Sequence, residues 1–261
     1  MFHERATVGT VEVNAVRLGY REYGDPDDPP VVLLHGSGSK AHTWERVAAR
    51  LTAGGHRSIA VDLRGHGTSD RTADYALSSI RDDVVHLLAA LDLRDVVLVG
   101  HSVGGYAALA AALQAPERIG RLVLEDLAAP PRETVRARPG DLLRLLSAGA
   151  GTLSGPRDYH LRAVASILRQ LSRPDPDWWA RLGQVRQPTL VLSGGPTSCI
   201  PPQRLADVTA AIHHARLSTI PVGHRVHSLA PDRFCTELLA FLRGPAGYLR
   251  EMSAAESNVT R

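Results

Sequence analysis

Ser102 stands where a serine could act as a nucleophile. The segment Gly100-His101-Ser102-Val103-Gly104-Gly105 follows an apolar β-branched run, residues 96–99, and leads into an alanine- and leucine-rich stretch that ends at 114. A serine in such a strand-to-helix turn has an exposed hydroxyl, and the next N–H lies at a helix start, where partial positive charge collects. The pattern therefore predicts a nucleophile elbow. A glycine-rich turn with an incidental serine has the same short pattern, so the rest of the chain must decide.

A serine nucleophile needs partners of defined chemistry. Its hydroxyl is unreactive at neutral pH, so an imidazole within hydrogen-bond reach must accept its proton. A carboxylate must hold that imidazole in one tautomer and stabilise its charged form. Two preplaced N–H donors must bind the oxyanion of the tetrahedral intermediate, and losing one such donor costs about 10² to 10³ in turnover.

The elements that would position these groups alternate between strand and helix patterns. An antiparallel pair is expected over residues 11–23, and the apolar runs 31–34, 57–62, 96–99 and 119–126 read as strands separated by amphipathic helices. Prolines and helical patterns without a strand fill 127–187, and the alternation then resumes to about 243. We expect a core formed by 1–126 and 188–261 with a helical cap inserted at 127–187.

Composition excludes several classes of protein. The chain has 261 residues, of which 44% are hydrophobic, which suits one domain with an insertion. The net charge of +3 is small and the basic residues are scattered, so no nucleic-acid partner is expected. Two cysteines, an N-terminus without an apolar signal and the lack of a long apolar run favour a cytoplasmic protein without a membrane partner. Oligomeric state is not indicated.

From about residue 11 to 243 the chain resembles the α/β-hydrolase superfamily. The motifs that carry the resemblance occur in the superfamily's order: HGSG at 35–38, DLRGHGTSD at 62–70, GHSVGG at 100–105, PTLVLSGG at 188–195 and PVGHRVHSLAPDRF at 221–234. The resemblance implies an α/β fold with a mostly parallel eight-stranded sheet flanked by helices. It also implies Ser102 as nucleophile, His224 as general base, and the N–H groups of Val103 and Ser37 as oxyanion donors.

The acid departs from the commonest pattern of the superfamily. Many members carry it shortly after the strand that here reads PTLVLSGG, but no carboxylate follows before Asp207, which lies in an expected helix. The chain instead resembles one subclass of haloalkane dehalogenases, whose acid follows the preceding strand. Glu125 and Asp126 occupy that place, and the distance to the following proline favours Asp126. A triad without an acid is the remaining alternative.

Other candidate residues were weighed against these. His227 is an alternative base, although a supporting role fits its place better. His35, His66 and His101 are interpreted as packing or loop-shaping residues, and Cys199 as a small buried filler. No spacing typical of a metal site occurs, so neither metal nor cofactor is expected. Three tryptophans, one after the HGSG loop and two in the expected cap, could bind substrate: Trp44, Trp178 and Trp179.

The sequence therefore favours a serine hydrolase that cleaves an ester, lactone or thioester of a small apolar substrate through an acyl-enzyme on Ser102. A serine at the elbow argues against dehalogenase and epoxide hydrolase chemistry, which needs a carboxylate nucleophile. One alternative is a non-hydrolytic enzyme on the same fold, such as a cyclase, lyase, C–C hydrolase or acyltransferase. Another is a ligand-binding receptor that keeps the triad residues.

Overall fold

One twisted sheet organises the chain. The computed structural model describes residues 6–133 and 158–244. Within them the sheet has the strand order β1-β2-β4-β3-β5-β6-β7-β8, and β2 runs antiparallel to both of its neighbours while all other pairs are parallel. The strands are β1 (Thr7–Val13), β2 (Val16–Tyr23), β3 (Pro30–Leu34), β4 (Arg57–Val61), β5 (Val96–His101), β6 (Ile119–Glu125), β7 (Thr189–Ser193) and β8 (Ala215–Thr219).

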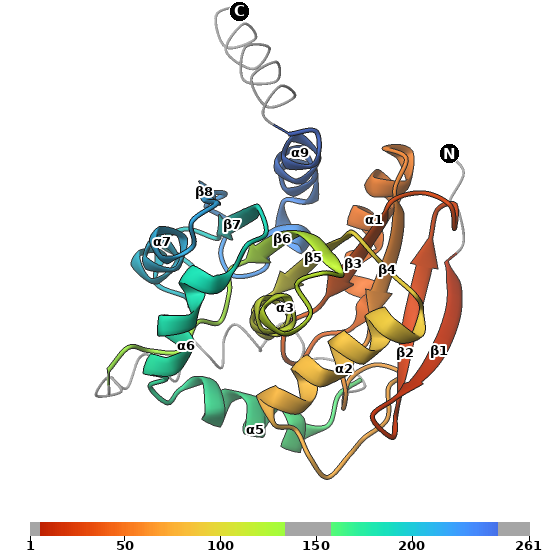
Figure 1. The fold of residues 1–261 in the computed structure, drawn as a ribbon, viewed down its shortest axis with the longest axis horizontal. Helices are drawn as coiled ribbons and strands as arrows, with labels where there is room; N and C mark the ends of the chain where they lie inside the picture. The colour runs from red at the N-terminus through yellow and green to blue at the C-terminus, as the bar shows by residue number, and fades with distance from the viewer. Residues whose placement is uncertain (1–5, 134–157, 245–261) are drawn as a thin grey trace, which may run out of the picture.

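Helices cover both faces of this sheet. Figure 1 shows α2 and α3 on one side and α1 and α9 on the other. The helical segments are η1 (Ala41–Trp44), α1 (Glu45–Ala53), α2 (Leu77–Ala90), α3 (Val103–Gln114), α5 (Leu161–Leu171), α6 (Pro176–Arg181), η2 (Leu182–Gln184), α7 (Pro202–Ala211), α8 (Val226–Leu229) and α9 (Pro231–Leu242).

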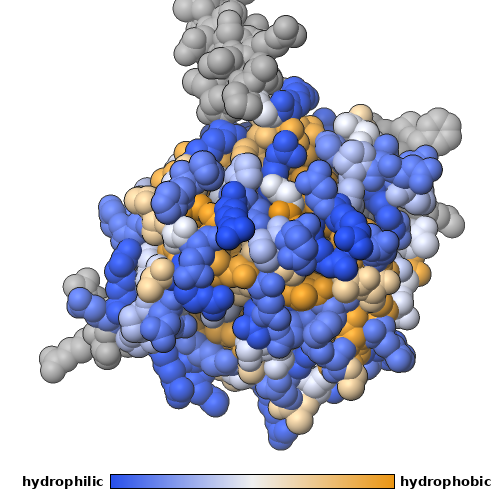
Figure 2. All heavy atoms as spheres, in the orientation of Figure 1, coloured by the Kyte–Doolittle hydropathy of each residue, from blue (hydrophilic) through white to orange (hydrophobic). Residues whose placement is uncertain are grey.

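The central strands are apolar at successive positions because both of their faces are covered. In β3, Val32 and Leu34 pack into the core under α2 and α3, whereas Val31 and Leu33 pack into the core under α1 and α9. All four side chains are fully buried. On the surface, hydrophilic residues separate the apolar ones over the face shown in Figure 2.

The structure confirms the expected fold class, an α/β-hydrolase fold with a mostly parallel eight-stranded sheet. The N-terminal antiparallel pair begins earlier than expected, at Thr7, and turns at Asn14 and Ala15, which both have positive φ angles. Such angles suit the two-residue turn of a tight hairpin.

Part of the expected cap is visible. Helices α5 and α6 lie within it, and Ile167, Trp178 and Leu182 pack into the same hydrophobic cluster as the sheet. The helical pattern predicted at 141–150 lies outside the described residues. The division into core and cap therefore stays a prediction.

Candidate active site

Ser102 occupies a sharp turn between β5 and α3. Its backbone is strained, with φ 54° and ψ −116°, a conformation that a side chain rarely adopts outside functional turns. Two glycines permit the turn. A Cβ on Gly100 would lie 2.3 Å from the Gly104 carbonyl oxygen, and one on Gly104 would lie 2.4 Å from the Leu34 carbonyl oxygen. The sequence motif therefore forms the expected elbow, with Ser102 half-buried at the wall of a cavity.

Asp126 and His224 form a buried pair beside that turn. His224 donates from Nδ1 to Asp126 Oδ2 over 2.6 Å, and the carboxylate is fully buried. Asp126 Oδ1 accepts from the Gly194 N–H at 2.8 Å, and Oδ2 also accepts from the Ser198 hydroxyl. These hydrogen bonds fix the orientation of the carboxylate. The structure thus brings together the serine, histidine and Asp126 that the resemblance implied.

The loops after β7 and β8 are held together by glycine contacts. Gly223 N–H donates to the Gly194 carbonyl at 2.9 Å, and a Cβ on Gly194 would lie 2.2 Å from the Gly223 carbonyl oxygen. Gly223 also has a φ of +90°, which glycine adopts without strain. This close approach of the two loops places His224 within hydrogen-bond distance of Asp126.

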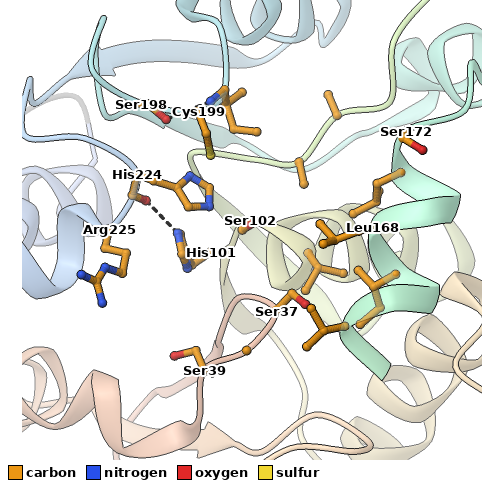
Figure 3. Close-up of a pocket in the computed structure, with 18 of the residues that line it drawn as sticks. Ser37, Ser39, His101, Ser102, Leu168, Ser172, Ser198, Cys199, His224 and Arg225 are labelled. Atoms are coloured by element: carbon orange, nitrogen blue, oxygen red, sulfur yellow. Dashed lines mark hydrogen bonds between the residues drawn. The ribbon is translucent and has the colours of Figure 1, made fainter. Parts of the chain in front are cut away.

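The charged form of His224 is stabilised in this setting. Burial alone would lower its pKa, but the hydrogen bond to Asp126 and the neighbouring Cys199 raise the pKa of His224 to about 10. Because the Asp126 oxygens can only accept, the proton on Nδ1 is fixed and Nε2 is the ring atom that exchanges a proton. Figure 3 shows His224 and Ser102 at the same wall, with Cys199 above the imidazole.

No described residue forms a hydrogen bond with Ser102 Oγ in this resting arrangement. Catalytic hydrogen bonds are often long before substrate binds, so this geometry is compatible with proton transfer to His224.

The two residues whose N–H groups are expected to bind an oxyanion, Ser37 and Val103, both line the cavity. Val103 begins α3, and Ser37 follows the His35-Gly36 pair after β3; neither N–H donates to another described residue. The Ser37 loop is held by two neutral histidines. His35 Nε2 accepts from the Leu63 N–H at 3.0 Å, and His66 Nε2 accepts from the Gly38 N–H at 3.1 Å.

The protonation states of these histidines follow from burial. Burial lowers the pKa of His35, and burial together with nearby His35 lowers the pKa of His66 to about 3. Both rings therefore stay neutral and accept hydrogen bonds at neutral pH. The interpretation of His35 and His66 as loop-shaping residues agrees with these contacts.

A second carboxylate–histidine pair lies beneath the first. Glu125 is fully buried and accepts from His227, through Nδ1 at 2.7 Å and through the backbone N–H at 2.9 Å. The consecutive acids at the end of β6 thus bind different histidines, Asp126 the one in the loop before α8 and Glu125 the one in α8. Glu125 does not contact His224, so the geometry favours Asp126 as its partner.

His101 links the elbow to the loop that carries the base. Its Nε2 lies 2.7 Å from the carbonyl oxygen of His224, which can only accept, so Nε2 carries the proton. Burial, together with nearby His224 and His227, lowers its pKa well below the ordinary value and keeps the ring neutral. His101 therefore connects the turn that carries Ser102 to the loop that carries His224, which is a more specific role than packing.

The cavity above these groups has a volume of about 710 Å³. Helix α5 contributes one apolar wall, formed by Val164, Ile167, Leu168 and Leu171. Polar and charged side chains line other parts of the cavity, among them Ser39, Lys40 and Arg225. This volume and lining suit a small amphipathic molecule.

The three tryptophans are not among the described residues that line this cavity, so their expected role in substrate binding stays a prediction. Trp44 is fully buried and stacks on His227, with ring centroids 4.0 Å apart. Trp179 donates from its indole nitrogen to the Pro130 carbonyl at 3.0 Å, and Trp178 stacks on Tyr106. Their large apolar surfaces serve packing between segments.

Three residues near the site were missed or misread in the sequence. Cys199 is half-buried beside His224 rather than a buried filler. Ser198 supports Asp126, and Arg225 lines the cavity directly after the base. The only sequence signal for Arg225 is its position directly after His224. No motif marks Cys199 or Ser198.

No cluster of three or more potential metal-ligating side chains occurs within residues 6–133 and 158–244. Over the same residues, no helix is long and apolar enough to cross a membrane.

Comparison with known proteins agrees with this geometry. The family model for the alpha/beta hydrolase fold matches residues 29–148. A protein of Variovorax paradoxus strain S110 named "Putative carbamate hydrolase RutD" is 30% identical, over 91% of this chain and 97% of its own length. The chain belongs to the α/β-hydrolase superfamily. Another α/β hydrolase similar to it is the sn-1-specific diacylglycerol lipase ABHD11 of Mus musculus, which is 29% identical over 84% of this chain and 82% of the lipase.

Solved structures of α/β hydrolases also superpose on the chain. A hydrolase from Pseudomonas aeruginosa aligns with a TM-score of 0.78 and 26% identity, over 91% of this chain and 98% of that protein. Est816, described as an N-acyl homoserine lactone degrading enzyme, aligns with a TM-score of 0.73 and 25% identity, over 89% of this chain and all of that one. These relatives support hydrolase chemistry while differing in substrate.

Proposed function

We propose that this α/β hydrolase cleaves a carboxylic ester, lactone or thioester with an apolar acyl group through an acyl-enzyme on Ser102. The observation that carries the proposal is the buried Asp126–His224 pair at 2.6 Å, which opens onto the cavity that Ser102 also lines. A carboxylate-bound imidazole beside an elbow serine is the arrangement that activates a hydroxyl.

The steps follow from the positions of the groups. His224 Nε2 takes the hydroxyl proton as Ser102 Oγ attacks the carbonyl carbon, and the oxyanion is bound by the N–H groups of Ser37 and Val103. His224 then gives that proton to the leaving group as the bond to it breaks. Water, deprotonated by His224 in the same way, then attacks the acyl carbon. His224 returns this proton to Ser102 Oγ as the acyl–Oγ bond breaks and the carboxylic acid leaves.

The raised pKa of His224 fits this cycle. Asp126 stabilises the imidazolium, which is the form present while the tetrahedral intermediate exists. The strained turn at Ser102 and the two unpaired N–H groups are in place before substrate binds, so little reorganisation is required.

The nature of the acyl group is inferred from the cavity wall. The aliphatic side chains of α5 would bury a short alkyl or acyl chain, with about 25 cal/mol gained per Å² of apolar surface removed from water. Two similar proteins, a diacylglycerol lipase and an N-acyl homoserine lactone degrading enzyme, support substrates with apolar acyl groups.

A panel of p-nitrophenyl esters, lactones and acyl thioesters of graded chain length tests the proposal. We expect turnover that Ser102→Ala abolishes and that the matched variant Ser218→Ala, on β8 outside the cavity, retains. Rapid quenching followed by mass spectrometry should find the acyl group on Ser102. Turnover that survives Ser102→Ala, or no turnover across the panel, would refute the proposal.

A further inference from the structure

The cavity has two unlike sides, and Ser102 lies between them. Figure 3 shows Arg225 and Ser39 on one side, and Leu168 of α5 with Ser172, the residue that follows α5, on the other. The apolar side has a use in the proposed function, as the acyl site. The proposed function assigns no role to the polar side.

The charges on the polar side do not balance. Among the described residues that line the cavity, Asp158 is the only carboxylate, and it is bound to Lys40 at 2.5 Å. Arg225 is half-buried, and no described residue forms an ion pair or hydrogen bond with its guanidinium. A guanidinium at the wall of a partly desolvated cavity attracts an anion more strongly than one in open water.

The chemistry of the reaction decides which part of the substrate reaches this side. His224 must give its proton to the leaving oxygen as the carbon–oxygen bond breaks, so the leaving group lies next to His224. Arg225 is its neighbour in sequence and also lines the cavity. The acyl group, bonded to the other side of the same carbonyl, is then directed toward α5.

We propose that Arg225 binds a carboxylate on the leaving group, so that the preferred substrate is an apolar acyl ester of a hydroxy acid. The inference rests on the proposed function and names the alcohol half of its substrate. One free guanidinium matches a singly charged, planar carboxylate, which it can bind through two parallel hydrogen bonds.

Arg204 is the competing cation at this cavity. It is half-buried in the first turn of α7, and its guanidinium donates to the Ala129 carbonyl at 3.4 Å. Arg204 therefore has a partner, whereas Arg225 has none among the described residues, and Arg204 lies in the first turn of α7 rather than directly after the proposed base. This difference makes Arg204 the informative comparison.

Two matched probes test the assignment: the hexanoate ester of 4-hydroxybenzoate and the hexanoate ester of methyl 4-hydroxybenzoate. They share an acyl chain and a phenol, and they differ in one negative charge. The quantity measured is the ratio of kcat/KM for the anionic probe to kcat/KM for the neutral probe. The ratio is compared in the wild type and in Arg225→Gln, Arg225→Lys and Arg204→Gln, with Arg233→Gln, exposed on α9, as control.

We expect Arg225→Gln to lower this ratio at least about tenfold, the loss of one charge-assisted hydrogen-bonded contact. Arg225→Lys should keep part of the ratio, because it retains the charge but not the paired geometry. A ratio unchanged in Arg225→Gln, or lowered by Arg204→Gln instead, overturns the assignment. If neither probe is turned over in a Ser102-dependent manner, the proposed function itself fails, which is a distinct result.

Discussion

Replacing Asp126 by asparagine is the most direct test of how this site works. The substitution keeps the size of the side chain but removes its charge. It also places an NH₂ group or a neutral carbonyl against His224 Nδ1, which now binds the carboxylate at 2.6 Å. If the NH₂ group faces Nδ1, the imidazole must carry its proton on Nε2 and can no longer accept the proton of Ser102.

The expected magnitude follows from the pKa of His224. A pKa raised from 6.5 to about 10 corresponds to about 5 kcal/mol of stabilisation of the imidazolium, shared between Asp126 and Cys199. Removal of the Asp126 share, together with the wrong tautomer, should lower kcat by about 10³ to 10⁴. Because the neutral imidazole is the base, kcat/KM of the wild type should rise with pH through a pKa above 6.5.

The assay compares kcat and kcat/KM for a neutral p-nitrophenyl ester over a range of pH. Glu125→Gln and Asp207→Asn are the matched controls, since Glu125 binds His227 and Asp207 lies in α7 with Gln203 as its partner. Thermal unfolding of each variant shows whether the fold persists, which matters because Asp126 is fully buried.

The result that would refute the reasoning is equally specific. If folded Asp126→Asn keeps more than a tenth of the wild-type kcat while Asp207→Asn loses activity, the acid belongs to the more common place after β7. If Glu125→Gln alone has the large effect, His227 and not His224 is the base.

Further expectations concern pH and stability. Cys199→Ala should lower the pKa read from kcat/KM, because Cys199 helps raise the pKa of His224; a pH profile that does not move contradicts this. Protonated His224 stabilises the folded state fully below pH 6.5 and progressively less up to about pH 10, so urea titrations of the wild type and His224→Gln should converge as the pH rises. Arg64→Met breaks a buried two-bond pair with Asp83, at 2.6 Å for each bond, and should cost about 3–5 kcal/mol of unfolding free energy. Gly104→Ala should prevent a native elbow, seen as lost labelling by a fluorophosphonate in a less stable protein.

The fold could be predicted because its signals are local and repeated. Each buried strand is an apolar run covered on both faces, and glycines mark the turns that leave it. The elbow could be predicted equally well, because only glycine fits at positions 100 and 104. A Cβ added to Gly100 or Gly104 would lie 2.3 or 2.4 Å from a backbone oxygen.

The hydrogen-bond partners of the candidate catalytic groups were harder to predict from the sequence. Glu125 and Asp126 are adjacent in sequence, and only the register of β6 against β5 and β7 sends one to His227 and the other to His224. The preference for Asp126 over Glu125 depended on a resemblance to a known family rather than on a sequence pattern. Trp44 shows a related difficulty, because its aromatic side chain suggested a pocket wall while tertiary packing stacks it on His227.

The same limit applies to the cavity. Cys199 and Arg225 are isolated residues in loops, where no periodicity reports orientation, so their positions beside His224 came from the arrangement in space. Sequence patterns describe faces of helices and strands, whereas a cavity is formed by the ends of several elements.

The placement of the acid directly after β6 has a consequence for how the site is assembled. Ser102 and Asp126 belong to one β5–α3–β6 unit, whereas His224 is 98 residues further along the chain. The proposed nucleophile and acid therefore share low-contact-order structure that can form early in folding, and the proposed base joins them when the C-terminal segment docks. Local opening of that segment would remove His224 from the site and abolish the proposed activity reversibly, while the Ser102 turn and Asp126 stay in place.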